Sequence, residues 1–194
     1  MFNFKFGRIL ALGAALSTLL PLAATAQPKP EGFLCCNLRT DGKWISDINY
    51  LEAGKRLVPM GTPAKVTGYG RYRVLVDLGD NTRQAIGNDY SRDIELGAFA
   101  QRYVVTEDPR QKLGAMPARQ QEAINKAMLM PGMTRAQVLM SVGYPVSSEN
   151  PSLDVRVWRF WLESFAEFQV MFDDAGLVKE ISTDPRTLSL VVME

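Results

Sequence analysis

The first 26 residues carry the pattern of a secretory signal peptide, which sets both the length of the chain that folds and the compartment in which it folds. Lys5 and Arg8 supply a positive start, and the stretch from Ile9 to Leu22 is almost wholly apolar. This stretch is too short for a membrane span, and Ala24-Thr25-Ala26 after it has the small-residue spacing of a cleavage site. We predict that residues 1–26 are removed by cleavage between Ala26 and Gln27.

Without the signal peptide the chain is close to electrically neutral. The full sequence has 22 basic and 21 acidic side chains, and removing Lys5 and Arg8 leaves 20 basic against 21 acidic. A balanced chain gives no reason to expect a nucleic acid partner. The 168 residues that remain of the 194 suffice for one domain or two small ones. No second long apolar run offers a transmembrane anchor.

The two cysteines are adjacent, which restricts their chemistry. In an oxidising compartment Cys35 and Cys36 can form a vicinal disulfide, bond to other chains or remain buried thiols. A structural pair on a buried edge is favoured over a redox role. Phe33-Leu34 stand where a lipoprotein signal needs small residues, so no lipid anchor is predicted. No C-x-x-C motif or metal-ligand spacing occurs.

The chain contains no histidine, which excludes Ser-His-Asp and Cys-His catalysis and the commonest zinc ligand. Carboxylates alone could still do acid–base chemistry. Asp173-Asp174, however, stands where a turn is expected, and Asp is common in turns. We therefore expect a non-catalytic protein without a metal or cofactor.

Residues 33–108 read as a β-rich domain, after a flexible lead-in over 27–32. The clearest strand alternates apolar Tyr72, Val74, Val76 and Leu78 with charged neighbours, and Gly79-Asp80-Asn81 predicts a tight turn after it. A further strand is expected over Phe99–Thr106. Short strands linked by Gly- and Pro-marked turns predict a small barrel, and this half resembles bacterial SH3-like barrels.

One polar loop of this half is a candidate ligand site. The run from Asn88 to Asp93 includes Tyr90 and Arg92, which could contact a ligand. Asn, Asp and Ser can equally satisfy backbone groups in a loop, with Tyr90 capping the barrel. The structural interpretation is favoured.

The rest of the chain predicts two helices followed by three strands. After a linker over 109–117, an amphipathic helix is expected over 118–130, ended by Pro131-Gly132. Thr134 and Gln137 form a capping box for a second helix, which ends at Gly143. Apolar strands and an Asp-Asp-Ala-Gly hairpin turn follow to residue 183. Residues 184–194 are expected to form a C-terminal apolar strand, docked on either domain or free to pair with a partner.

Four motifs in order carry a resemblance to a known family. They are Gly132-Met133-Thr134-x-x-Gln137-Val138, Gly143-Tyr144-Pro145, Trp158-Arg159-Phe160-Trp161 and Phe172-Asp173-Asp174-Ala175-Gly176-Leu177-Val178. Together they resemble the BamE (SmpA/OmlA-type) domain over about residues 118–182. The resemblance implies an α-α-β-β-β fold of two layers, like that of β-lactamase inhibitor proteins, and a periplasmic location. Its best-known members are accessory lipoproteins of the outer-membrane β-barrel assembly machine, whereas this chain lacks a lipobox.

The expected fold class is therefore α+β, with an SH3-like barrel before a BamE-like domain. The expected function is an exported protein-interaction module of the bacterial envelope, an accessory or scaffold of outer-membrane assembly. Tyr144, Trp158, Trp161, Tyr90 and Arg92 are candidates for the interaction surface. Trp158 and Trp161 are three residues apart in a strand, so one is expected in the core and the other exposed. A cell-wall or small-ligand module acting through the first half, and a thiol redox protein using Cys35 and Cys36, remain alternatives.

Overall fold

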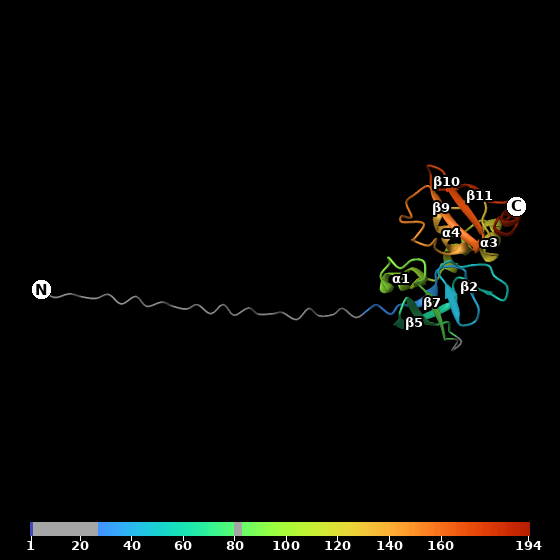
Figure 1. The fold of residues 1–194 in the computed structure, drawn as a ribbon. Coiled ribbons are helices and arrows are strands. Elements are labelled where there is room, and N and C mark those ends of the chain that lie inside the picture. The colour runs from blue at the N-terminus through green and yellow to red at the C-terminus, as the bar shows by residue number, and fades with distance from the viewer. Residues whose placement is uncertain (2–26, 80–82) are drawn as a thin grey trace.

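The computed structural model describes Met1, residues 27–79 and residues 83–194. The predicted signal peptide with its cleavage site before Gln27, and the predicted turn at Asp80-Asn81, lie outside these residues. The chain is α+β, as expected: a curled mixed sheet in the first half and a smaller antiparallel sheet in the second (Figure 1).

The first sheet has eight strands and curls into a half-barrel. The strands are β1 (Glu31–Leu34), β2 (Leu38–Thr40), β3 (Trp44–Ser46), β4 (Arg56–Val58), β5 (Pro63–Gly70), β6 (Arg73–Asp77), β7 (Arg83–Gly87) and β8 (Val104–Val105). Their order is β4-β2-β3-β7-β6-β5-β1-β8, and only β3 and β7 run parallel among the described pairs. The buried alternation of Val74 and Val76 in β6 confirms the centre of the predicted strand, whereas Tyr72 precedes β6 with φ of +55° and is 40% exposed.

The second half follows the predicted order of two helices and three strands. The elements are α3 (Ala118–Asn125), α4 (Arg135–Val142), β9 (Val157–Glu163), β10 (Ala166–Phe172) and β11 (Val178–Ser182). The capping box is confirmed, because Gln137 N donates to Thr134 Oγ1 at 3.3 Å and Thr134 N donates to Gln137 Oε1 at 2.7 Å. The sheet order is β11-β10-β9.

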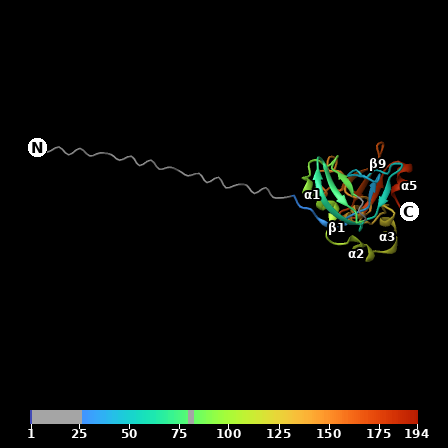
Figure 2. The ribbon, with the colours of Figure 1, turned by 90° about the horizontal axis from the view of Figure 1, so that it is seen from below.

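Helices α3 and α4 lie between the three-stranded sheet and the curled sheet (Figure 1), and Figure 2 shows α2 and α3 along one edge of the molecule. Their buried residues, such as Ile124 and Val138, share one core cluster with Trp158, Phe168 and Phe172 of the three-stranded sheet. The curled sheet has its own core, which contains Leu34 and Phe99. The protein thus has two hydrophobic cores and one helical layer that faces both.

Three segments expected to be extended or irregular are helices. Residues 99–106, expected as a strand, lie mainly in α1 (Leu96–Tyr103), because the Glu95 carboxylate accepts from Gly97 N and Ala98 N. The expected linker contains α2 (Pro109–Gly114), and the expected C-terminal strand is α5 (Pro185–Val191). Both begin with an aspartate N-cap followed by proline, at Asp108 and Asp184, a combination that favours a helix start.

The lead-in predicted over 27–32 overlaps the first sheet at its end, because residues 31 and 32 belong to β1. Strand β1 starts at Glu31, and Val66 N donates to Pro30 O at 2.9 Å.

Among the described residues, no helix has the length and hydropathy needed to cross a membrane.

Candidate functional site

The two halves meet across a buried polar junction built from Asn37 and Asn49. The side-chain amide of Asn37 donates to Ile124 O at 2.5 Å and to Ser141 O at 3.1 Å, and its backbone N–H donates to Met140 O at 3.0 Å. Asn37 is 1% exposed. A loop residue of the first half therefore satisfies carbonyl groups of α3 and α4.

Asn49 completes this junction from the following loop. It donates from Nδ2 to Val142 O at 2.9 Å and accepts from Arg39 N at 2.7 Å. Gly143, which ends α4 with φ of +84°, lies beside this amide, and a Cβ there would come within 3.4 Å of Asn49 Nδ2. Because buried amides need all their partners, this network fixes how the two halves sit on one another.

The loop that contains Tyr90 is held by both halves. Asp47, 2% exposed, accepts from Tyr90 N at 3.0 Å and from Asp89 N at 3.3 Å. On the other side, Ser148 N donates to Tyr90 O at 3.2 Å. These bonds support the favoured structural interpretation of the loop backbone, whereas the Tyr90 ring is 44% exposed.

Burial raises the pKa of Asp47 to about 6, although the backbone bonds from Tyr90 and Asp89 and the Ser91 hydroxyl oppose this shift. The loop anchor is therefore a carboxyl group whose pKa lies well above its ordinary value of 3.8. Its ionisation state affects the contacts that hold the Tyr90 loop.

Tyr50 and Leu51 of the first half link the Tyr90 loop to the end of β9 in the second half. Burial raises the pKa of Tyr50, and the neighbouring Tyr90 and Glu149 raise it further. A hydrogen bond with Ser164 lowers it. Leu51 N donates to Leu162 O at 2.7 Å, which ties the first-half loop to the end of β9. We define the junction aromatic surface as Tyr50, Leu51, Tyr90, Trp161 and Phe165.

Phe165 is the most exposed side chain of this surface. It stands in the turn between β9 and β10 and is 99% exposed, while Leu51 is 38% exposed. A large apolar side chain fully in solvent loses the free energy that burial would supply, about 2 kcal/mol for phenylalanine. Its ring is therefore the part of this surface that gains most when a partner covers it.

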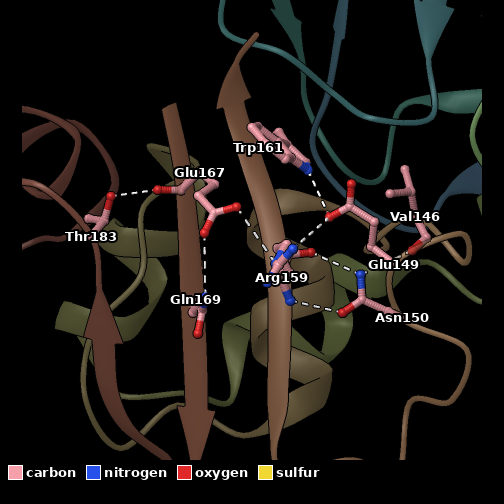
Figure 3. A network of polar contacts seen from close by, with 8 residues as sticks. All are labelled: Val146, Glu149, Asn150, Arg159, Trp161, Glu167, Gln169 and Thr183. Carbon is pink, nitrogen blue, oxygen red and sulfur yellow. Dashed lines mark hydrogen bonds and ion pairs between the residues drawn. The ribbon is translucent and has the colours of Figure 1, made fainter. Parts of the chain in front are cut away.

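Trp161 is held at this surface by a polar network on the outer face of β9 (Figure 3). Its indole Nε1 donates to Glu149 Oε2 at 3.0 Å. The Arg159 guanidinium lies 3.8 Å from Glu149 and 3.7 Å from Glu167. Arg159 thus lies between two carboxylates, and Glu149 in turn orients the indole.

Asn150 blocks the neighbouring edge of the sheet. Its side-chain amide accepts from Arg159 N at 2.8 Å and donates to Arg159 O at 3.0 Å, which imitates one step of strand pairing (Figure 3). A further donor bond reaches Val146 O at 3.0 Å. A partner therefore meets side chains here rather than an open strand edge.

The candidate residues do not form one site. Trp158 is 1% exposed in the core and packs edge-on against Phe172 at 4.8 Å, so it is not part of an interaction surface. Trp161 is partly exposed, which confirms that the two tryptophans face opposite ways. Arg92 stacks over the Tyr72 ring at 4.5 Å on the surface of the first half.

Tyr144 and Cys35 lie together, in a cleft away from Tyr90 and Trp161. Both line a cavity of about 320 Å³ between the halves. Cys35 and Cys36 form a vicinal disulfide, the first of the alternatives considered for this pair. Sequence reasoning gave no signal that Tyr144 and Cys35, 109 positions apart, would share a cavity.

Sequence reasoning also missed Tyr50, Leu51 and Phe165. One local signal existed for Phe165, because a phenylalanine in a hairpin turn has no sheet face to pack against.

Among the described residues, no group of three or more Cys, Asp or Glu side chains is arranged to hold a metal ion. Comparison with protein-family models, curated proteins and solved structures finds no match for this chain.

Proposed function

We propose that this protein is an exported, non-catalytic interaction module of the bacterial envelope, which binds another protein through the junction aromatic surface. The observation that carries the proposal is the complete exposure of Phe165, at 99%, in the hairpin turn directly after Ser164, which hydrogen-bonds to Tyr50. Aromatic side chains of this kind are the usual anchors of protein interfaces. Export through the predicted signal peptide would place the protein in the periplasm.

The rigidity of the junction supports this role. The backbone of Tyr90 is anchored by Asp47 and Ser148, and the indole of Trp161 is anchored by Glu149. A loop backbone and an indole that are already held in place lose less conformational entropy when a partner covers them. The surface is therefore suited to recognise one partner in one orientation.

The order α3-α4-β9-β10-β11 supports a BamE-type fold for the second half. The curled sheet supports the proposal that the first half is related to SH3-like barrels. On this proposal the protein acts as an accessory or scaffold of outer-membrane barrel assembly. The chain departs from the lipoproteins of that machine because Phe33-Leu34 replace a lipobox. It would be held at the membrane by its partner rather than by a lipid.

In-cell crosslinking followed by mass spectrometry tests the proposal. We compare the tagged protein with Phe165→Ser and with Leu190→Ser, a matched change at a 45% exposed residue of α5 outside the surface. Phe165→Ser should lose the captured partner while Leu190→Ser retains it. Equal capture by all three would contradict the surface, and capture without barrel-assembly components would contradict the accessory role.

The stacked pair Arg92 and Tyr72 favours the competing proposal of a cell-wall binding module. A guanidinium held 4.5 Å above an exposed ring offers both a charge and a flat face to a glycan or peptide carboxylate. Cosedimentation of the protein with purified peptidoglycan, lost in Arg92→Ala and retained in Phe165→Ser, would favour this function instead. A thiol redox role would require loss of function in the Cys35→Ser/Cys36→Ser variant.

A further inference from the structure

A cleft lies between the halves, distinct from the junction aromatic surface. Its volume is about 320 Å³, within the range typical of small-molecule sites. Cys35 lines it from the first half, and Leu139 and Met140 line it from α4. Val105 at the end of β8 and Pro109 at the start of α2 also line it.

The lining is apolar and rich in polarisable groups. Leu139, Val105 and Pro109 supply aliphatic contacts, Met140 and the disulfide of Cys35 supply sulfur, and Tyr144 supplies an aromatic ring. Sulfur atoms make favourable contacts with aromatic rings at about 5 Å. This combination favours a flat aromatic ligand over a polar one.

The charged residues of the cleft neutralise one another. Lys112 Nζ lies 3.3 Å from Glu107 Oε2, and both side chains are more than two thirds exposed at the rim. Glu107 would repel an anionic ligand and Lys112 would repel a cationic one. Neither kind of charged ligand is therefore attracted to the rim on balance. The rim therefore favours an uncharged molecule.

The walls are positioned before any ligand binds. Cys35 N donates to Tyr103 O at 2.9 Å, and the Tyr103 ring meets Tyr144 edge-on at 5.7 Å. Arg102 lies 5.4 Å from the centre of the Tyr144 ring on another side. A cleft whose walls are fixed in this way costs little to organise when a ligand enters.

We propose that this cleft binds a small, uncharged aromatic molecule against the Cys35–Cys36 disulfide. The proposal goes beyond protein interaction, because the cleft shares no residue with the junction aromatic surface. Binding there would bring a ligand into contact with both halves.

Occupation of the cleft would also control reduction of the disulfide. Cys36 is fully buried, whereas Cys35 is partly exposed and lines the cleft. A thiolate of dithiothreitol would attack Cys35 Sγ, and the S–S bond would break with Cys36 leaving as a thiolate that takes a proton. The second thiol of the reagent would then displace Cys35 as a thiol and close the oxidised ring. A ligand in the cleft would shield Cys35 Sγ from the first attack.

Fluorescence titration with the uncharged probe N-phenyl-1-naphthylamine tests the binding. Wild type should show saturable enhancement, and Ala136→Phe should bind at least about tenfold more weakly, because Ala136 is an exposed residue of α4 that lines the cleft. Ala118→Phe is the matched control, an exposed helical alanine of α3 outside the cleft. Equal binding by Ala136→Phe and wild type, or no saturable binding by wild type, would overturn the proposal.

The rate of disulfide reduction tests it independently on the unaltered chain. Saturating probe should slow the appearance of free thiols under dithiothreitol at least about fivefold. An unchanged rate would show that the probe binds elsewhere and would overturn the proposal. This measurement decides the matter even where Ala136→Phe fails to fold.

Discussion

Asn49 donates a hydrogen bond from its side-chain amide to the backbone carbonyl oxygen of Asn37, at 3.1 Å, at the point where the two halves of the protein meet. Each asparagine also bonds to carbonyl groups of the helical layer, Asn37 to Ser141 and Asn49 to Val142. Two loop residues of the first half thereby donate hydrogen bonds to carbonyl oxygens near the end of α4, which would otherwise bind water. We expect the halves to unfold as one unit because of this contact.

Removal of the Asn37 amide should destabilise the whole protein. In Asn37→Ala, Met60 N–H and Ser141 O lose their buried partner, and each such loss costs about 1–3 kcal/mol. The free energy of unfolding, measured by urea denaturation, should fall by about 3 kcal/mol. Asn125→Ala, at an exposed asparagine, should change it by less than about 0.5 kcal/mol. Similar values for the two variants would contradict a structural role for Asn37.

Asn49 combines a hydrogen-bonding role with a backbone role, and two substitutions separate them. Its φ is +57°, a region that glycine adopts freely and alanine does not. Both Asn49→Gly and Asn49→Ala lose the amide, but only alanine adds backbone strain. Asn49→Ala should therefore be less stable than Asn49→Gly by about 1 kcal/mol in the same denaturation experiment. A more stable alanine variant would show that the loop relaxes out of this conformation.

Asp47 should make stability depend on pH in an unusual direction. The pKa of its carboxyl is raised to about 6 by burial, against an ordinary value of 3.8. The folded protein therefore holds this proton more tightly than the unfolded chain. Asp47's contribution is most favourable below about pH 4 and is lost as pH rises through 6, by about 3 kcal/mol in all.

The Asp47→Asn variant isolates this contribution. It cannot ionise, so its stability relative to wild type should rise between about pH 4 and pH 7. Chemical denaturation of both proteins across this range measures the difference, and other titrating groups cancel. A difference that stays constant with pH would mean that Asp47 titrates normally in the folded protein.

Local signals explain why the second half was predictable. The capping box of Thr134 and Gln137, the glycine after α4 and the hairpin turn at Asp173 each act within a few residues. Together these local signals predict the order of two helices and three strands. The same kind of signal was present at Asp108-Pro109 and Asp184-Pro185, where it marks helix starts rather than a linker and a strand.

The candidate surfaces could be predicted only in part. Tyr90 and Trp161 were found because aromatic residues in a loop or on an outward strand face are recognisable singly. Tyr50 lies near them only because the buried junction brings the two halves together. The contacts of this junction link residues far apart in the sequence, such as Asn37 and Ser141. The Cys35–Tyr144 cleft depends on the same junction. Neither pairing has a periodic or local signal.

The two tryptophans of β9 should respond differently to truncation. Trp158 is 1% exposed and packs against Phe172, so Trp158→Ala leaves a large cavity and should lower the free energy of unfolding by about 3–5 kcal/mol. Trp161 lies on the outer face, where its indole bonds to Glu149, so Trp161→Ala should cost about 1 kcal/mol or less.

Partner capture then separates stability from binding. Because Trp161→Ala leaves the fold intact, any loss of crosslinked partner in this variant reports on the junction aromatic surface itself. The Glu149→Gln variant keeps an acceptor for the indole, so the Trp161 orientation and the captured partner should both be retained. Loss of the partner in Glu149→Gln with retention in Trp161→Ala would mean that the charge of Glu149, rather than the indole, contacts the partner.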